Sequence, residues 1–163
     1  PMPTIARVNG AAMGGGVGLT ACCDIAIAAE TAIFGLTEVR LGIIPGAISP
    51  YVLRAIGPHA ARRYFLTGER FDAATAWRIG LVHEVAPVDG LDAVVDGLLD
   101  GLLAAGPQAV RAAKDLIAHV ALKEIDDLLI RDTAQRIARQ RAGAEAREGL
   151  GAFLDKRKPG WTA

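Results

Sequence analysis

The chain has 163 residues, 52% of them hydrophobic, and its 18 lysines and arginines balance 18 aspartates and glutamates. This length is enough to bury a core, and the balanced charge provides no global field that would attract nucleic acid or an anionic membrane. No apolar run is long enough to span a bilayer and no leader-like segment precedes one, so we expect a cytoplasmic protein without nucleic-acid or membrane partners.

The beginning of the sequence lies very close to the first predicted core element. Pro1-Met2-Pro3 leads directly into a strand-like run at 4–8. A natural start is rarely placed there, so we expect an N-terminal portion to precede this sequence. The adjacent Cys22 and Cys23 are interpreted as small core residues in a reducing compartment.

The first half of the chain alternates strand-like and helix-like segments. The pattern predicts strands at 4–8, 24–28, 32–34 and 81–85, and a buried helix at 17–23. A strand, a helix and a second strand in this order predict a parallel pair with a right-handed crossover.

Capping and breaking residues predict three further helices in this half. Ser49 is expected to be an N-cap followed by Pro50 at the first helical position, and Asp72 is expected to cap another helix. The expected ends lie at Gly57, near Gly68 and at Gly80.

The pattern becomes helical from Leu91 onward. Apolar residues recur at helical spacing on both sides of the Gly106-Pro107 break, the charged stretch 131–147 predicts a long helix with one wet side, and 146–155 predicts a last short helix. We therefore divide the chain into an α/β portion, residues 1–88, and a helical portion, residues 89–163.

A glycine-dense turn is the most informative local feature. Four of the five positions from Gly14 to Gly18 are glycine, and the apolar run after them predicts a helix start. Free N–H groups at a helix start favour negative charge, so the turn is suited to an oxyanion. Glu38 follows as a single acid–base candidate.

The order of motifs resembles the enoyl-CoA hydratase/isomerase (crotonase) superfamily. Six segments of the sequence carry the resemblance: 6–16, 23–28, 34–38, 41–45, 66–73 and 80–82, and the ending 152–159 is also similar. The resemblance covers the whole chain but only the later part of the family domain. It implies an α/β fold of crotonase type, the later turns of a β-β-α spiral, followed by a helical C-terminal oligomerisation region.

The resemblance also implies a ligand and a site. Family members bind an acyl-CoA thioester and hold its carbonyl oxygen with two backbone N–H groups, of which the second falls on Gly15. The first donor comes from an earlier segment that this sequence does not contain, so we expect the 163-residue chain alone to be poorly active or inactive. Coenzyme A is part of the substrate, and no separate cofactor or metal is implied. The implied substrate-binding residues are Gly14, Gly15, Gly16, Gly18, Leu36 and Pro45.

The carboxylates separate two possible reactions. Hydratases of this family with two glutamates carry one at the position of Gly18, where this chain has none, and the second at the position of Glu38. One carboxylate is sufficient to move a proton between two carbons, as a Δ3,Δ2-enoyl-CoA isomerase requires, or to deliver a proton to C2 during hydration. Hydration and isomerisation both stay open at this point.

A finer resemblance favours hydration of a branched or carboxylated acyl group. Segments 16–24, 35–39 and 47–52 are similar to the bacterial methylglutaconyl-CoA hydratase branch, which implies a place in leucine degradation. Gly18 is expected to leave space for such an acyl group and to remove a repelling charge, and Arg40 and Tyr51 are candidate partners for an acidic tail.

The resemblance implies partners as well. The family packs its helical region between subunits, so we expect a homotrimer, which can pair into a hexamer. Lys156, in the basic tail 156–158, is the candidate for binding coenzyme A phosphates at a neighbouring subunit.

Several other interpretations compete with these. Residues 16–21 also fit the G-x-G-x-x-A dinucleotide fingerprint, although seven residues separate it from the preceding strand, and the glycines can form a tight turn without a ligand. Glu38 can be a solvated surface carboxylate paired with Arg40. A non-catalytic binding or assembly role is the alternative from another functional class.

Overall fold

The computed structural model describes residues 2–162, which form two compact units. We call residues 4–97 the α/β unit, and residues 98–162 with 2–3 the helical unit. The elements of the α/β unit are β1 (Ile5–Val8), β2 (Ala11–Met13), α1 (Gly15–Cys22), β3 (Ile25–Ala29), β4 (Ile33–Gly35), the 3-10 helix η1 (Thr37–Leu41), α2 (Ser49–Thr67), β5 (Arg70–Asp72), α3 (Ala73–Arg78), β6 (Glu84–Ala86) and the 3-10 helix η2 (Val88–Gly90).

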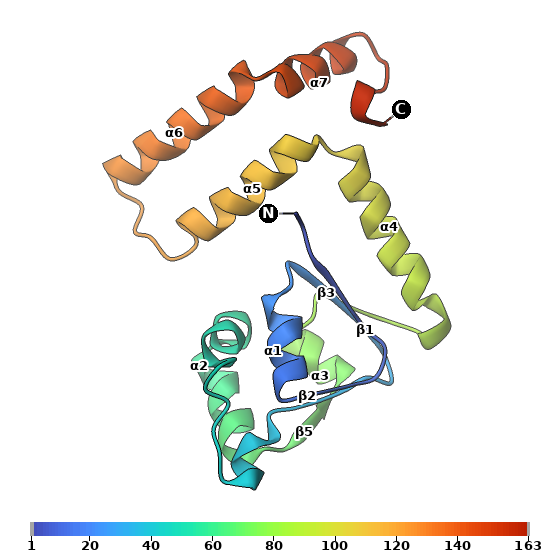
Figure 1. Ribbon diagram of the computed structural model, residues 1–163, viewed down its shortest axis with the longest axis vertical. Coiled ribbons are helices and arrows are strands. Elements are labelled where there is room, and N and C mark those ends of the chain that lie inside the picture. Colours follow the sequence, from blue (N-terminus) through green and yellow to red (C-terminus); the bar gives the residue numbers. More distant parts are fainter. Residues whose placement is uncertain (1, 163) are drawn as a thin grey trace. The chain divides into compact units, whose positions relative to one another are not determined.

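The strands build two small sheets in a repeating β-β-α order (Figure 1). The first sheet has the order β1-β3-β6 with parallel pairs, and the second has the order β2-β4-β5, in which β4 and β5 are antiparallel. Each of the first two repeats therefore gives one strand to each sheet before its helix. The predicted parallel pairing of the first strand with the next one is confirmed, with Ile5 opposite Ile25.

The α/β unit has a closed core. Val17 from α1, Phe34 from β4 and Val52 from α2 are fully buried. Phe34 stacks on Phe71 with ring centroids 5.7 Å apart, and Tyr64 lies 4.3 Å from the same Phe71 ring. These contacts join the second sheet to α2 and fix the position of the segment between β4 and η1.

The helices of this unit follow most of the predicted signals. Gly57, with φ of 71°, divides α2 into two helical parts, and Gly68 ends it in the left-handed conformation. The Asp72 side chain accepts a hydrogen bond from the Thr75 N–H at 2.8 Å, so the predicted cap is confirmed. The expected N-cap at Ser49 is wrong, because Ile48 precedes the helix and the Ser49 hydroxyl donates to the Gly46 carbonyl at 3.0 Å.

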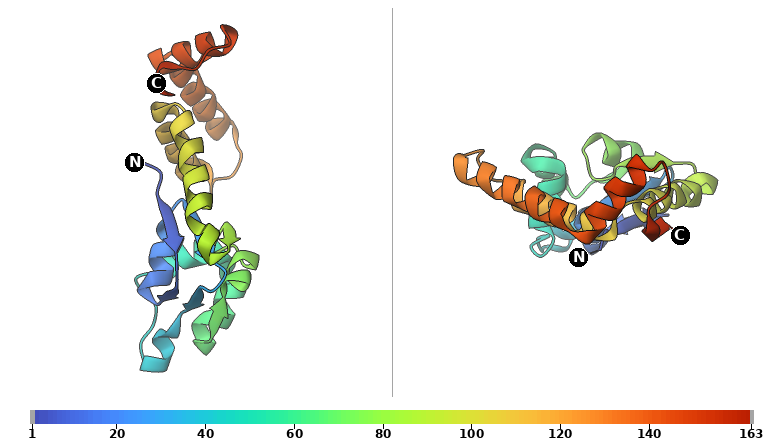
Figure 2. Two further views of the ribbon diagram at one scale, coloured as in Figure 1. Left: turned by 90° about the vertical axis from the view of Figure 1, so that its right-hand side faces the viewer. Right: turned by 90° about the horizontal axis from the view of Figure 1, so that it is seen from above.

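The helical unit consists of helices joined by short connections (Figure 1). Gly143 has an extended backbone and ends one helix, so the predicted helix over 131–147 is divided there, and the two helices on either side run in different directions (Figure 2). No helix among the described residues is long and apolar enough to cross a membrane. The elements are α4 (Leu91–Ala104), which begins in the α/β unit, α5 (Pro107–Val120), α6 (Asp127–Ala142), α7 (Ala144–Leu154) and the 3-10 helix η3 (Gly160–Thr162).

Polar contacts hold the helical unit together. Arg136 on α6 donates to Asp132 at 2.8 Å and to Asp115 on α5 at 2.7 Å. After α7, Arg157 turns back to Glu148 with contacts of 2.7 and 3.0 Å. These contacts join segments of the helical unit through polar side chains that are partly exposed to solvent.

Candidate active site

The glycine turn between β2 and α1 is fixed on both sides by its backbone. Gly14 has φ of 50° and ψ of −113°, a combination that side-chain-bearing residues rarely adopt. Its N–H donates to the Gly35 carbonyl at 2.8 Å, and its carbonyl accepts from Val17 and Gly18 at 3.0 and 3.2 Å. The start of α1 is thereby tied to the end of β4.

The first residues of α1 lie next to open space. Gly15 is the first residue of the helix, where a backbone N–H has no acceptor within the helix. A Cβ built on Gly15 would find no atom of another segment within 4 Å among the described residues, and Gly15 is exposed. The helix start can therefore donate a hydrogen bond to a ligand oxygen, in the direction that the macrodipole favours.

Glu38 lies against this glycine turn. It belongs to η1, which begins directly after the buried Leu36, and a Cβ built on Gly14 would lie 3.0 Å from Glu38 Oε1. Glu38 Oε2 is buried and has no hydrogen-bond partner among residues 2–162. A buried carboxylate oxygen without a partner is unusual in a folded protein.

Arg40 is directed away from this carboxylate. A Cβ built on Gly68 would lie 3.1 Å from Arg40 Cγ and 3.2 Å from Nε, so Arg40 packs at the end of α2. The pKa of the neighbouring Glu69 is lowered, mainly by its hydrogen bond from Arg63 and to a smaller extent by the charge of Arg40. The alternative interpretation of Glu38 as a surface carboxylate paired with Arg40 is therefore wrong.

Gly18 does not leave open space, which corrects the expectation drawn from its missing side chain. A Cβ built there would lie 2.7 Å from Ile48 Cβ and closer still to Ile48 Cγ2. The residue before α2 fills the position, because Ile48 packs onto α1. No spacing signal in the sequence relates two residues that are thirty positions apart, so Ile48 was missed.

The remaining predicted site residues lie in different surroundings. The Leu36 side chain is fully buried in the core, so it supports the β4–η1 connection from within. Pro45 is buried beside a small apolar hollow of about 210 Å³ that Val39 also lines. Lys156 belongs to the helical unit, where it is exposed after α7 with a left-handed φ of 55°.

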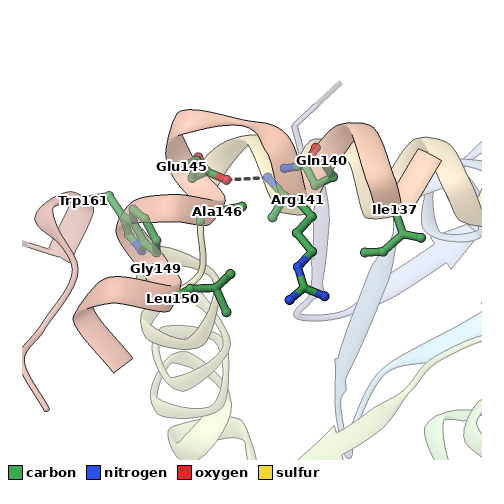
Figure 3. Close-up of a pocket in the computed structure, with 10 residues that line it drawn as sticks. Ile137, Gln140, Arg141, Glu145, Ala146, Gly149, Leu150 and Trp161 are labelled. Carbon is green, nitrogen blue, oxygen red and sulfur yellow. Dashed lines mark hydrogen bonds between the residues drawn. The ribbon is translucent and has the colours of Figure 1, made fainter. Parts of the chain in front are cut away.

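A larger apolar hollow lies within the helical unit (Figure 3). It measures about 470 Å³ and includes Ile137, Leu150 and Trp161 in its lining. The Glu145 carboxylate at this hollow accepts from the N–H groups of Gln108 and Ala109 at 2.8 and 2.7 Å, the second contact being the dashed line in Figure 3. Glu145 thus caps the start of α5.

No metal site is formed by the described residues, in which no group of three or more His, Cys, Asp and Glu side chains is arranged to hold an ion. At the glycine turn the structure brings together the Glu38 carboxylate and the N–H groups at the start of α1. Such a pair, a carboxylate next to hydrogen-bond donors for an oxyanion, is suited to proton transfer at a carbon beside a carbonyl group.

Comparison with known proteins defines the class to which this arrangement belongs. The fold is the mixed α/β crotonase fold: an enoyl-CoA hydratase from Shewanella pealeana superposes with a TM-score of 0.92 at 49% identity, over 98% of this chain and 59% of that one. Pseudomonas aeruginosa AtuE gives a TM-score of 0.89 at 43% identity, over 94% of this chain and 60% of its own.

The family follows from the sequence match. The enoyl-CoA hydratase/isomerase model matches residues 1–163, and the chain belongs to this family. The crotonyl-CoA hydratase of Syntrophomonas wolfei is 39% identical over 157 residues, which cover 96% of this chain and 60% of the relative. The chain thus spans about 60% of the length of the curated relatives it matches.

Proposed function

We propose that the complete protein adds water to a 2-enoyl-CoA thioester, with Glu38 as its acid–base group. The observation that carries the proposal is the buried, unpartnered Glu38 Oε2 beside the glycine turn. Leaving such a group without a partner costs about 1–3 kcal/mol, so its retention is understandable if the missing partner is the reactant.

The proposed reaction uses the carboxylate twice. The Gly15 N–H donates to the thioester carbonyl oxygen while Glu38 takes a proton from water and the resulting hydroxyl bonds to C3. The electron pair of the C2–C3 double bond moves toward the thioester, and the charge on its oxygen is stabilised by the donor. Glu38 then returns the proton to C2, which gives a 3-hydroxyacyl thioester by syn addition.

The second candidate reaction is Δ3,Δ2-isomerisation. It is favoured because the site has Glu38 but no second carboxylate at position 18. That position is a glycine, and Ile48 fills the space beside it. Glu38 would take a proton from C2 of a 3-enoyl-CoA and return it to C4, again through an enolate held at Gly15. No water is consumed in this reaction, which provides the means to distinguish it.

For the acyl group we propose a branched or carboxylated chain of the methylglutaconyl type. The support is the resemblance of segments 16–24 and 47–52 together with the absence of a second carboxylate at Gly18, which removes one source of repulsion for an acidic tail. Because Arg40 packs at Gly68, Tyr51, which is 52% exposed on α2, is the better of the two candidate partners for that tail.

The test is turnover by the purified full-length protein of methylglutaconyl-CoA, crotonyl-CoA and a 3-enoyl-CoA, with product masses measured. Hydration adds the mass of one water to a 2-enoyl substrate, whereas isomerisation leaves the mass unchanged. Turnover of the 3-enoyl substrate alone, without uptake of water, would show that the hydratase proposal is wrong. Binding of the thioesters without any turnover would support the non-catalytic alternative.

We also propose that the helical unit packs between subunits of a trimer or a paired trimer. The support is the exposure of large apolar side chains on its helices, including Ile117 at 66%, Ile137 at 65% and Leu128 at 73%. Light scattering at micromolar concentration should give a mass of three or six chains, and a stable monomer would contradict this proposal.

A further inference from the structure

Ile48 and Gly18 form a steric pair that joins two helices. Gly18 is buried in α1, and Ile48 is the half-buried residue directly before α2. Because the position of a Gly18 Cβ is only 2.7 Å from Ile48 Cβ, the two residues can occupy this space only if one of them has no side chain. In this chain the Ile48 side chain occupies the space that a side chain at position 18 would need.

The backbone on both sides holds Ile48 in place. Its carbonyl accepts from the N–H groups of Tyr51 at 3.1 Å and Val52 at 3.0 Å, and the next residue, Ser49, donates its N–H to the Pro45 carbonyl at 3.0 Å. A β-branched side chain has few χ1 conformations, so a fixed backbone also fixes where its methyl groups lie. The Ile48 side chain therefore forms a rigid wall, because it has few other conformations to adopt.

This wall stands one helical turn from the proposed acid–base group. Gly18 donates its N–H to the Gly14 carbonyl at 3.2 Å, so the two glycines are successive contact points on α1. Glu38 Oε1 lies at the first of them and Ile48 at the second. The branched apolar side chain of Ile48 thus lies against α1 about one turn after the point where the Glu38 carboxylate lies against it.

We propose that Ile48 is a specificity-determining residue that limits the branch an acyl group can carry next to Glu38 to the single methyl group of a methylglutaconyl-type chain. The inference rests on the proposed function, since it assigns Ile48 a role toward the acyl chain of the same site. Shortening Ile48 should open room for one or two methyl groups beside the reacting carbons, and pockets discriminate one methylene by about 10–200-fold.

The first measurement concerns the steric pair alone and needs no activity. Gly18→Ala should lower Tm by about 4 °C or more, because the added methyl group overpacks against Ile48. Combining it with Ile48→Ala should restore much of that loss, which makes the two effects non-additive. Additive Tm changes would overturn the steric pair.

The second measurement concerns specificity. Wild type, Ile48→Ala and the milder Ile48→Val are compared on crotonyl-CoA, on methylglutaconyl-CoA and on the bulkier 3-ethyl derivative of crotonyl-CoA. The ratio of kcat/KM for the 3-ethyl substrate to that for methylglutaconyl-CoA should rise about tenfold in Ile48→Ala and less in Ile48→Val. Ile43→Ala, a variant of the same loop at a 57% exposed isoleucine, should leave the ratio unchanged.

The outcomes separate this inference from the function on which it rests. An active wild type with the same ratio in all variants would overturn the role of Ile48 and leave the proposed function standing. A wild type that turns over none of the three thioesters would overturn both, even if the Tm values are non-additive.

Discussion

The α/β unit and the helical unit are stabilised in different ways. In the α/β unit, large side chains such as Phe34, Leu36 and Val52 are fully buried. Among the described residues of the helical unit, Ala152 is the only buried hydrophobic one, and its neighbours Phe153 and Leu154 are 80% and 77% exposed. The α/β unit thus has a core of its own, whereas the helical unit depends on polar contacts and leaves its apolar side chains uncovered.

This difference explains where an unsatisfied carboxylate can be maintained. Natural domains have only a small net stability, so a buried oxygen without a partner must be offset by other contacts nearby. The aromatic contacts of Phe34, Tyr64 and Phe71 and the buried β4–η1 connection supply such contacts in the α/β unit, to which Glu38 belongs. In the helical unit the carboxylates of Glu145 and Glu148 instead accept hydrogen bonds and serve the fold.

The largest expected effect tests the contrast between the two units directly. Phe34→Ala should reduce the free energy of unfolding by about 3–5 kcal/mol, because it empties a buried aromatic site. Phe153→Ala should change it by no more than about 0.5 kcal/mol in the monomer, because that ring is already solvated. Urea denaturation at low protein concentration measures both, and equal losses would contradict the division between a closed core and open helices.

The next effect concerns the unpartnered carboxylate of the α/β unit. Glu38→Gln keeps the shape of the side chain and removes its ability to transfer a proton, so kcat of the complete protein should fall by about 10² or more. Glu69→Gln is the matched control, since Glu69 in the same unit is hydrogen-bonded to Arg63 and lies outside the glycine turn. Activity of Glu38→Gln within a few-fold of wild type would exclude Glu38 as the acid–base group.

How far the sequence predicts each unit also differs. In the α/β unit, the breaks at Gly57 and Gly68 and the Asp72 cap are readable, because each depends on local conformational preferences. The strands β2 and β5 were missed because three residues are too few to show alternation. In the helical unit, the break at Gly143 was missed because the charged residues around it continue a helical pattern.

The candidate site shows the same limit. The glycine turn and Glu38 can be selected from motifs, and the structure brings Glu38 Oε1 next to Gly14. The burial of Oε2 and the contact between Ile48 and Gly18 could not be predicted, because both depend on how η1 and α2 pack against α1. Absence of a side chain in a sequence therefore does not show that its space is empty.

The smallest expected effect concerns the polar contacts that replace a core in the helical unit. Hydrogen bonds from Arg157, and next from the Gly160 N–H, lower the pKa of Glu148 from 4.5 to about 2. Because the pKa is lower in the folded state, the charged carboxylate stabilises the fold above about pH 4.5, and this contribution is lost as the pH falls toward 2. The C-terminal segment after α7 should therefore loosen in this pH window.

Trp161 reports this loosening, since its indole Nε1 donates to the Ala104 carbonyl at 3.2 Å and its ring lies against Gly149. In a Trp77→Phe background, the fluorescence of Trp161 should change between pH 4.5 and 2, the interval set by the Glu148 pKa. Glu148→Gln should shift this change or flatten it, because the glutamine cannot become protonated in that window, whereas the exposed Glu124→Gln should leave it as in the parent. An identical titration in Glu148→Gln and Glu124→Gln would mean that groups other than Glu148 hold the C-terminal segment in place. The helical unit would then depend less on the ion pair between Glu148 and Arg157.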